Sequence, residues 1–232
     1  MARVATTERS HGRRRAVRVG RPPRELAGEV ETRILNAARR AFLERGLDGA
    51  SIDEIARIAR AGKPTIYARF PNKEALFTAV VMQDVAANVA GFEVHTPTGV
   101  TIEERLASVA VAILERILVS DAIRLMRVAI AEARRFPNLA SSVYRMARER
   151  GAQAVARLLG EVAQSDMVGT LPAFAPEHVA TTTRFFQDLV IMPLLMRALF
   201  GENLKLLRAE IGPHATCSIA FFVAACMRGG VA

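Results

Sequence analysis

The stretch SIDEIARIARAGKPTIYARFPNKEALF, from Ser51 to Phe77, decides the fold of this chain. Ser51 is a residue type that caps helix N-termini, and Glu54 follows at the spacing of a capping box. Apolar residues recur at helical spacing, pause at a turn that ends near Gly62, and resume behind Pro64. Proline suits the first turn of a helix, where amides lack partners anyway. The stretch therefore predicts two short helices joined by a tight turn.

The outward face of the second short helix would carry Lys63, Thr65, Tyr67 and Arg69. Two cations, a hydroxyl and an amphipathic ring offer donors to phosphate oxygens and to the edges of bases. Two helices joined by a tight turn, the second of which bears such side chains, are typical of a helix-turn-helix that enters the major groove. We therefore predict that this face reads double-stranded DNA.

The residues of this stretch resemble the DNA-binding domain of TetR/AcrR-family transcriptional regulators. The match extends over residues 30 to 80 and rests on Ile55-Ala56, Lys63-Pro64-Thr65-Ile66-Tyr67, Phe70-Pro71 and Lys73-Glu74-Ala75-Leu76-Phe77. The family usually has glycine where this chain has Arg60, so either Arg60 adopts a positive φ or the turn differs. The resemblance, together with the residue chemistry, predicts these DNA-contacting residues: Ser51, Lys63, Pro64, Thr65, Tyr67, Arg69 and Lys73.

Lys73 begins a further expected helix, which follows the N-cap Asn72 and runs toward Ala90. Its ammonium and the free amides of the first turn would together hold a DNA phosphate. Because this helix would touch DNA at one end and enter the next domain at the other, we expect it to link the two mechanically.

Positive charge is concentrated at the same end of the chain. The formal net charge is +9, and residues 1 to 25 hold eight arginines against two glutamates. Residues 1–27 are interpreted as a disordered basic arm. The segment Gly20-Arg21-Pro22 resembles part of an AT-hook, so Arg21 is a candidate for the minor groove. The alternative is a solvated tail that adds only non-specific affinity.

The rest of the pattern predicts an all-α protein of two domains. A helix over Val30–Arg45, ended by Gly46, would complete a three-helix DNA-binding domain over residues 28–75. The larger helical domain, residues 76–232, would bind an effector and dimerise. Its expected helices are Thr101–Leu118, Asp121–Phe136, Asn138 to about Gln164, Glu177–Phe200 bent at Pro193, and Leu204–Met227. The expected core of the first domain is Ile34, Leu35, Phe42, Ile52, Ile55, Ile66, Phe70 and Leu76.

The last two expected helices are apolar on most of their faces, and few other helices of the chain remain to cover them. We therefore expect a homodimer that buries these faces. The family resemblance implies the same interface, built from the last two helices of each subunit. The segment from Arg124 to Leu139 also resembles the AefR-type C-terminal domain of some AcrR-like regulators.

The resemblance further implies an effector cavity in the helical domain. Its candidate residues are aromatic, thioether or aliphatic groups: Phe92, Met126, Ile130, Tyr144, Phe174, Phe185, Phe186 and Met192. The alternative for each is an ordinary place in the core. An apolar cavity would suit a small lipophilic ligand. The function implied is a ligand-responsive repressor that acts as a homodimer on a palindromic operator. The alternative is a constitutive DNA-binding or architectural protein without an effector.

Other classes find little support in the sequence. The four histidines are far apart, without metal-ligand spacing, and no nucleophile elbow, P-loop or dinucleotide fingerprint is present. We therefore expect no catalysis, no cofactor and no metal site. With no secretory signal and no run of 18 uncharged apolar residues, a cytoplasmic protein without a membrane span is expected.

Overall fold

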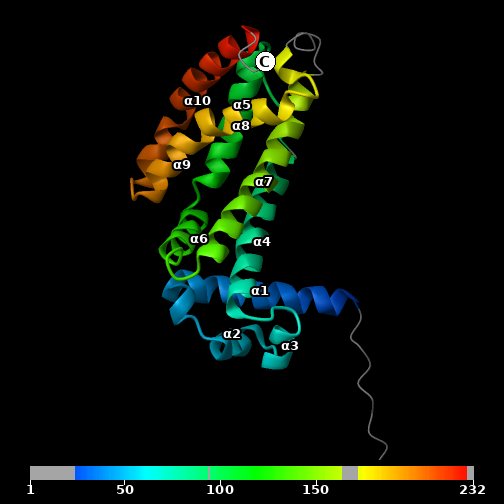
Figure 1. The fold of residues 1–232 in the computed structure, drawn as a ribbon, viewed down its shortest axis with the longest axis vertical. Helices are drawn as coiled ribbons and strands as arrows, with labels where there is room; N and C mark the ends of the chain where they lie inside the picture. The colour runs from blue at the N-terminus through cyan, green and yellow to red at the C-terminus, as the bar shows by residue number, and fades with distance from the viewer. Residues whose placement is uncertain (1–23, 94, 164–171, 229–232) are drawn as a thin grey trace, which may run out of the picture.

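The computed structural model describes residues 24–93, 95–163 and 172–228, and every regular element in these ranges is a helix. The molecule is elongated, with a small domain at one end of a larger helical body (Figure 1). The α-helices are α1 (Arg24–Gly49), α2 (Ile52–Ala59), α3 (Lys63–Tyr67), α4 (Lys73–Glu93), α5 (Ile102–Ile117), α6 (Ser120–Ala131), α7 (Pro137–Ala163), α8 (Val179–Phe186), α9 (Met192–Leu199) and α10 (Leu204–Met227). Residues 1–23 of the predicted arm, with Arg21, lie outside the described residues, whereas residues 24–27, which were assigned to the arm, belong to α1.

The small domain forms because α1 packs against both α2 and α4, and α3 packs against α2, so that the apolar faces of these helices share one buried cluster. Phe42 of α1 and Phe77 of α4 are both fully buried, and their rings meet edge to face with centroids 5.2 Å apart. Seven of the eight expected core residues are buried, and Ile52 packs at the margin of the same cluster. The predicted core of this domain is therefore confirmed.

The small domain does not end sharply where the body begins. Leu125 and Ala129 of α6 and Val143 of α7 belong to the same apolar cluster as the buried residues of α1 to α4. α6, the turn after it and the start of α7 thus rest directly on the small domain (Figure 1). The two parts are therefore joined by continuous side-chain packing.

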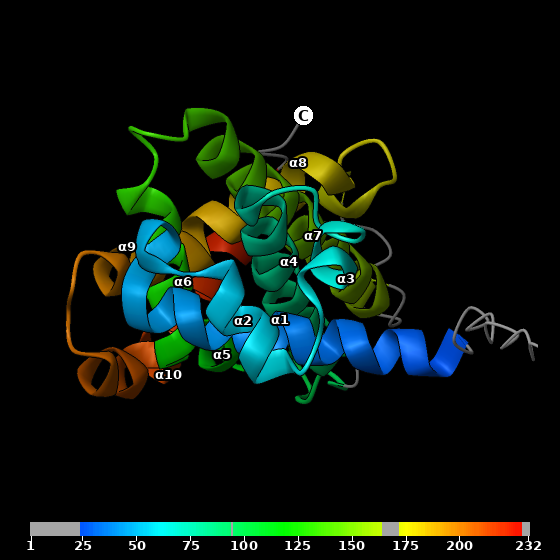
Figure 2. The ribbon, with the colours of Figure 1, turned by 90° about the horizontal axis from the view of Figure 1, so that it is seen from below.

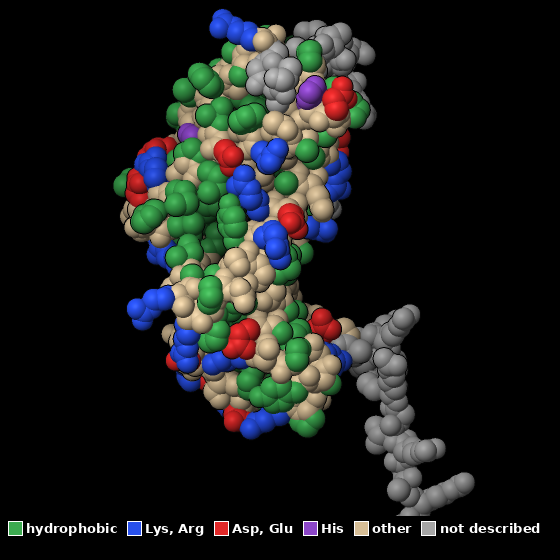
Figure 3. Space-filling model, in the orientation of Figure 1, with side chains coloured by type: hydrophobic (Ala, Val, Ile, Leu, Met, Phe, Trp, Pro, Cys, Tyr) green, Lys and Arg blue, Asp and Glu red, His purple; other side chains and the backbone are tan. Residues whose placement is uncertain are grey.

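The body surrounds a second apolar cluster, built mainly from α5, α7, the segment from α8 to α9, and α10. Phe186 of α8 and Phe222 of α10 meet edge to face in it, at 5.6 Å. α10 has the predicted bounds. Its buried residues fall on one side, whereas Leu206 and Phe221 are 60% and 72% exposed. Figure 3 shows apolar side chains gathered on the flank formed by α9 and α10.

By length and composition alone, α10 resembles a membrane span: its most apolar 18-residue window has a mean hydropathy of 1.3. However, 39% of that window is buried within the protein. The helix packs as a core helix along one side, and its other side is available to a partner.

Two sequence expectations about helices need correction. The helix expected over Glu177–Phe200 runs without a break from Val179 to Leu199, but it consists of α8, the π-helical segment η2 (Gln187–Ile191) and α9. Pro193 lies in the first turn of α9, directly after the π-helical segment. α6 ends at Ala131, five residues earlier than expected.

The ends of two other helices differ as well. α1 begins at Arg24, before the expected start at Val30. Gly46, with φ 69° and ψ −177°, breaks the helix where its end was predicted, and a further short helical stretch runs to Gly49. α4 extends to Glu93, beyond Ala90, toward which it was expected to run. Its predicted N-cap is confirmed, since Asn72 Oδ1 accepts from the amide of Ala75 at 2.7 Å. At the start of α5, Thr101 forms a capping box with Glu104.

Candidate nucleic-acid interface

A residue in the left-handed conformation ends α2 and redirects the chain toward α3. Arg60 adopts φ 50° and ψ 44°, and the amide of Ala61 donates to the carbonyl of Ala56 at 3.0 Å, which closes the end of α2. Gly62 then takes the N-cap position of α3 in an extended conformation. The positive φ inferred for Arg60 is therefore confirmed. This turn fixes how α3 sits against α2.

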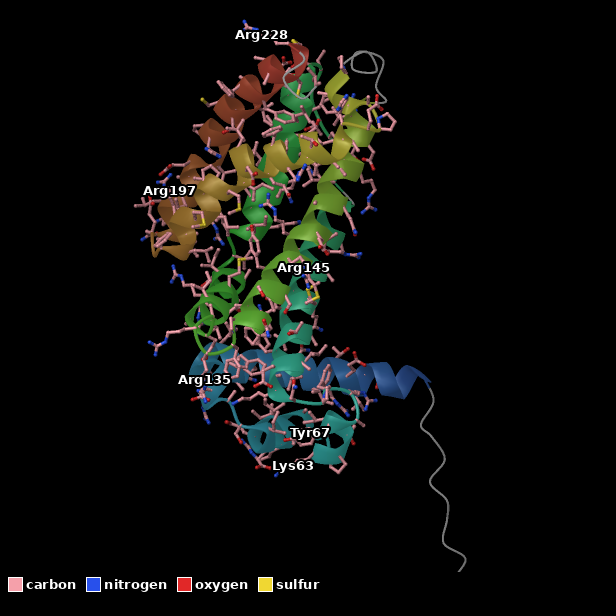
Figure 4. The ribbon with its side chains drawn as sticks, viewed as in Figure 1. Lys63, Tyr67, Arg135, Arg145, Arg197 and Arg228 are labelled. Atoms are coloured by element: carbon pink, nitrogen blue, oxygen red, sulfur yellow. The ribbon has the colours of Figure 1, made fainter. Side chains whose placement is uncertain are left out.

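The side chains of α3 divide into one buried anchor and an outward face. Ile66 is 1% exposed, whereas Tyr67 is 49% exposed. Lys63 and Pro64 are exposed too, and Thr65 is half-buried. Lys63 and Tyr67 lie at the end of the molecule farthest from the body (Figure 4). Seen from that end, α2 and α3 lie in front of α1 (Figure 2). The face predicted to read DNA is accessible.

Two cations of the predicted DNA-contacting set have partners within the small domain. Lys63 forms an ion pair with Asp53 of α2. Arg69 donates through Nη1 to the carbonyl of Thr65 at 3.3 Å, and its Nε lies 3.9 Å from Glu31 Oε2. DNA phosphates would compete with these contacts for both side chains.

Lys73 has a different environment from the one expected. Its Nζ donates to the carbonyls of Asp48, at 2.8 Å, and Ala50, at 3.2 Å. The ammonium thus satisfies carbonyls at the end of α1 and joins that end to the start of α4. A phosphate contact by Lys73 stays a prediction, and it would have to replace these two hydrogen bonds.

The capping box predicted at the start of α2 is wrong. Ser51 occupies the N-cap position and is exposed, but its side chain makes no capping hydrogen bond. Glu54 instead forms an ion pair with Arg45 of α1, with Nη1 and Oε2 2.6 Å apart. The charged partner on the neighbouring helix has displaced the local hydrogen bond. Ser51 is therefore free to donate to a phosphate.

The DNA contacts predicted from the sequence did not include Arg57 or Arg60. Both are exposed, Arg57 on α2 and Arg60 in the turn before α3. A simple signal was available, because cations within or just before a helix-turn-helix turn lie beside the DNA-facing helix. They add positive charge next to α3.

The eight candidate effector residues differ widely in burial. Phe186 is fully buried in the core, while Ile130, Tyr144 and Phe185 are each more than half exposed. Met126, Phe174 and Met192 are half-buried, and the side chain of Phe92 is outside the described part of the structure. The effector pocket stays a prediction.

Three arginine contacts tie the DNA-binding end to the body. Arg39 of α1 donates to both carboxylate oxygens of Asp84 on α4, at 3.0 and 3.3 Å, and to Asp121 on α6 at 3.0 Å. Burial lowers the pKa of Arg39, but the two carboxylates outweigh this effect and the pKa is raised overall. Arg39 thus links α1 to both α4 and α6 through charged hydrogen bonds.

The other two contacts start from the body. Arg124 of α6 donates to the carbonyl of Leu43 at 2.7 Å, and Arg135 Nη1 lies 2.7 Å from Asp48 Oδ1. Each reaches α1 from α6 or from the turn after it. No local pattern links partners so distant in the sequence, so sequence reasoning missed all three contacts.

Comparison with known proteins agrees with this geometry. Residues 34–80 match the model for "Bacterial regulatory proteins, tetR family", and residues 104–226 match that for "AefR-like transcriptional repressor, C-terminal domain". The second match alone spans more than half of the chain. The chain belongs to the TetR family of transcriptional regulators. Both resemblances found in the sequence are therefore confirmed, as is the all-α fold of a helix-turn-helix domain followed by a helical body.

Individual TetR-family relatives match over shorter stretches. The HTH-type transcriptional regulator UidR of Escherichia coli K12 is 41% identical over 66 residues, which are 28% of this chain and 34% of UidR. The HTH-type transcriptional activator FasR of Mycolicibacterium smegmatis is 31% identical over 119 residues, 50% of this chain and 53% of FasR. The chain thus spans only about a third to a half of these relatives.

A solved structure extends the likeness over most of the fold. The flavonoid-responsive regulator FrrA is 26% identical, with a TM-score of 0.64, and the match covers 85% of this chain and 97% of FrrA. The helical body is therefore of the same kind as that of a regulator whose name states a small-molecule response.

Proposed function

We propose that this TetR-family chain is a repressor that binds operator DNA as a homodimer and releases it when a small lipophilic ligand binds the helical body. The observation that carries the proposal is the exposed face of α3. Lys63 and Tyr67 lie at the end of the molecule away from the body, with the half-buried Thr65 between them in the sequence, while the buried Ile66 anchors the helix to the domain. Donors and a ring on a helix presented in this way suit the major groove.

The dimer would form on the flank of α9 and α10. The exposed side of α10 combines Phe221 and Leu206 with small residues, and Phe200 after α9 is 85% exposed. In a twofold dimer each subunit covers the same apolar patch of its partner. Two copies of α3 would then meet two half-sites of a palindrome, one helical turn of about 34 to 36 Å or a multiple of it apart.

Repression rather than activation is favoured by the match of the C-terminal half to an AefR-like repressor domain. The ligand class is favoured by the apolar body and by FrrA, whose name states that it responds to flavonoids. Ligand and DNA must weaken each other by the same factor, because their coupling is reciprocal. A regulator of this kind works in the cytoplasm, where its operator is, and needs no catalytic group.

Binding to the DNA upstream of its own gene, measured at two salt concentrations, tests the proposal. The chain offers a matched pair of substitutions, because Tyr67 and Tyr144 are its two tyrosines and are 49% and 57% exposed. Tyr67→Ala should weaken binding by about tenfold or more, the loss of a specific base contact. Tyr144→Ala, on the body, should leave DNA binding unchanged. Equal effects of the two substitutions would contradict the assigned recognition face.

Release by ligands separates a responsive repressor from an architectural protein. A screen of planar lipophilic compounds against the protein–DNA complex should find compounds that lower operator affinity. Tight binding that no compound in such a panel relieves would favour the constitutive alternative.

A further inference from the structure

An open hollow of about 430 Å³ lies where the small domain meets the body, away from the eight predicted effector residues. Its lining comes from the first turns of α4, the turn between α6 and α7, and the first turns of α7. Its most informative members are Glu74, Thr78, Arg135, Phe136, Leu139 and Ser142. The volume falls within the range of about 300 to 1,000 Å³ that is usual for small-molecule sites.

The lining of this hollow carries one carboxylate, that of Glu74, and one guanidinium, that of Arg135. The carboxylates of Asp48, Glu132 and Glu74 all raise the pKa of Arg135, with Asp48 the strongest. The ammonium of Lys73 also acts on Asp48, but it is held by backbone carbonyls. Because Arg135 is already paired with Asp48, Glu74 is the charged lining residue that has no ion pair among the described residues. A cation would be attracted.

Glu74 provides an anchor for such a cation. This residue is half-buried, and the nearby guanidinium of Arg135 pairs with Asp48 rather than with it. Beside it, Phe136 and Leu139 offer apolar surface, and the guanidinium of Arg135 already stacks over the Phe136 ring at 5.3 Å. The ring therefore favours a cationic group at this place.

We infer that this junction hollow binds a small amphipathic organic cation, whose charged group pairs with Glu74 and whose apolar part packs on Phe136 and Leu139. Arg135 holds the neighbouring carboxylates in the empty protein, so the ligand and the Arg135 guanidinium compete for the same negative charge. The site is separate from the cavity expected in the body.

A ligand bound in this hollow would affect the predicted DNA-binding face through a few contacts. The Arg135–Asp48 ion pair and the hydrogen bonds from Lys73 to Asp48 and Ala50 hold the segment that leads into α2. A cation paired with Glu74 repels the neighbouring Arg135 guanidinium, weakens the Arg135–Asp48 ion pair and so loosens this segment from the body. This regulatory effect rests on the proposed function, whereas ligand binding itself does not.

Three probes that differ only in charge test the inference on the full chain: 4-phenylbutylamine, 4-phenylbutanol and 4-phenylbutanoate. Ligand-observed NMR titration without DNA gives their affinities. The amine should bind most tightly. Glu74→Gln should weaken the amine by about three- to fivefold and leave the alcohol unchanged, as for loss of one partly exposed ion pair. Glu161→Gln, an exposed carboxylate on the far part of α7, is the matched control and should have no effect.

Arg135→Met should change the affinity for the amine in the opposite direction from Glu74→Gln. Removing the competing guanidinium while keeping its apolar stem should tighten binding of the amine. A purely structural role of these residues would instead make Glu74→Gln and Arg135→Met change affinity in the same direction. Equal affinity for all three probes, or tighter binding of 4-phenylbutanoate, would overturn the site.

Operator affinity is measured separately from the binding of the probes. With the amine present, operator affinity should fall in the unsubstituted protein and not in Glu74→Gln. If the amine binds through Glu74 but operator affinity is unaffected, the regulatory part is overturned. If no operator DNA is bound at all, the proposed function fails while the NMR result still decides the site.

Discussion

At the scale of single residues, Asp53 limits what the recognition helix offers to DNA. Its carboxylate forms an ion pair with Lys63 on the accessible face of α3 and is itself 68% exposed. Asp53→Asn should free the ammonium and remove a negative charge beside the phosphates. We expect operator affinity to rise by about two- to fivefold at low salt, with a smaller gain at high salt because exposed charges are screened.

Fluorescence anisotropy with labelled operator DNA at two ionic strengths measures this change. Asp188→Asn is the matched control, since Asp188 pairs with Arg148 on the body, 2.8 Å apart, and is also exposed. A gain from Asp188→Asn as large as that from Asp53→Asn would show that overall charge, not the position beside α3, is responsible.

The pKa of Asp48 reports on the contact between body and DNA-binding end. The hydrogen bond and charge of Arg135 hold this pKa below its usual value of 3.8. A lowered pKa in the folded protein means that the contact stabilises the fold above pH 3.8 and that this stabilisation is lost as pH falls through the lower, folded value. Carboxyl-detected NMR should find the Asp48 pKa below 3.8, and Arg135→Met should return it toward the usual value. An unchanged Asp48 pKa in that variant would refute the ion pair in solution.

At the scale of helices, Arg39 holds α1 against both α4 and α6. Its side chain is 28% exposed and contacts two carboxylates, so its removal leaves partly buried acceptors without their donor. Arg39→Met should lower the free energy of unfolding by about 1–3 kcal/mol. Denaturant unfolding measures this loss, and Arg40→Met, its exposed neighbour on α1, should change stability by less than about 0.5 kcal/mol. Similar losses for both would mean that Arg39 acts only through its alkyl chain.

The helices that could be predicted from the sequence are those whose signals are local. Apolar spacing, Arg60 and Gly62 placed α2 and α3, and the pattern of α10 gave its bounds. The failures came from partners or backbone effects that no local pattern contains. Glu54 pairs with Arg45 on another helix and does not accept from the Ser51 amide. Pro193 has no N–H, and the residues just before it form a π-helical segment.

The candidate site was predictable to a similar degree. The residue types on the outer face of α3 follow from helical spacing alone, so Tyr67 could be placed. The internal partners of Lys63 and Lys73 depend on how α1, α2 and α4 pack, and the Arg39 contacts join residues 45 and 82 positions apart. Such contacts arise only in the folded arrangement.

At the scale of the whole molecule, the exposed side of α10 should hold two subunits together. Phe221→Glu places a charge in the middle of this apolar flank, where pairing would bury it without a partner. We expect sedimentation to show a monomer at micromolar concentration and operator affinity to fall at least about tenfold. Ile130→Glu, which changes an equally apolar exposed residue on α6, should remain dimeric. A dimer in both variants would place the interface elsewhere.

The central claim is that two copies of the α3 face, held by a paired helical body, read double-stranded DNA. Selection of bound sequences from random duplex oligonucleotides tests it most directly. The expected result is an enriched motif with twofold symmetry, whose half-site centres are one helical turn or a multiple apart, and which Tyr67→Ala no longer enriches. Enrichment of an asymmetric single site, or of the same motif by Tyr67→Ala, would contradict the claim.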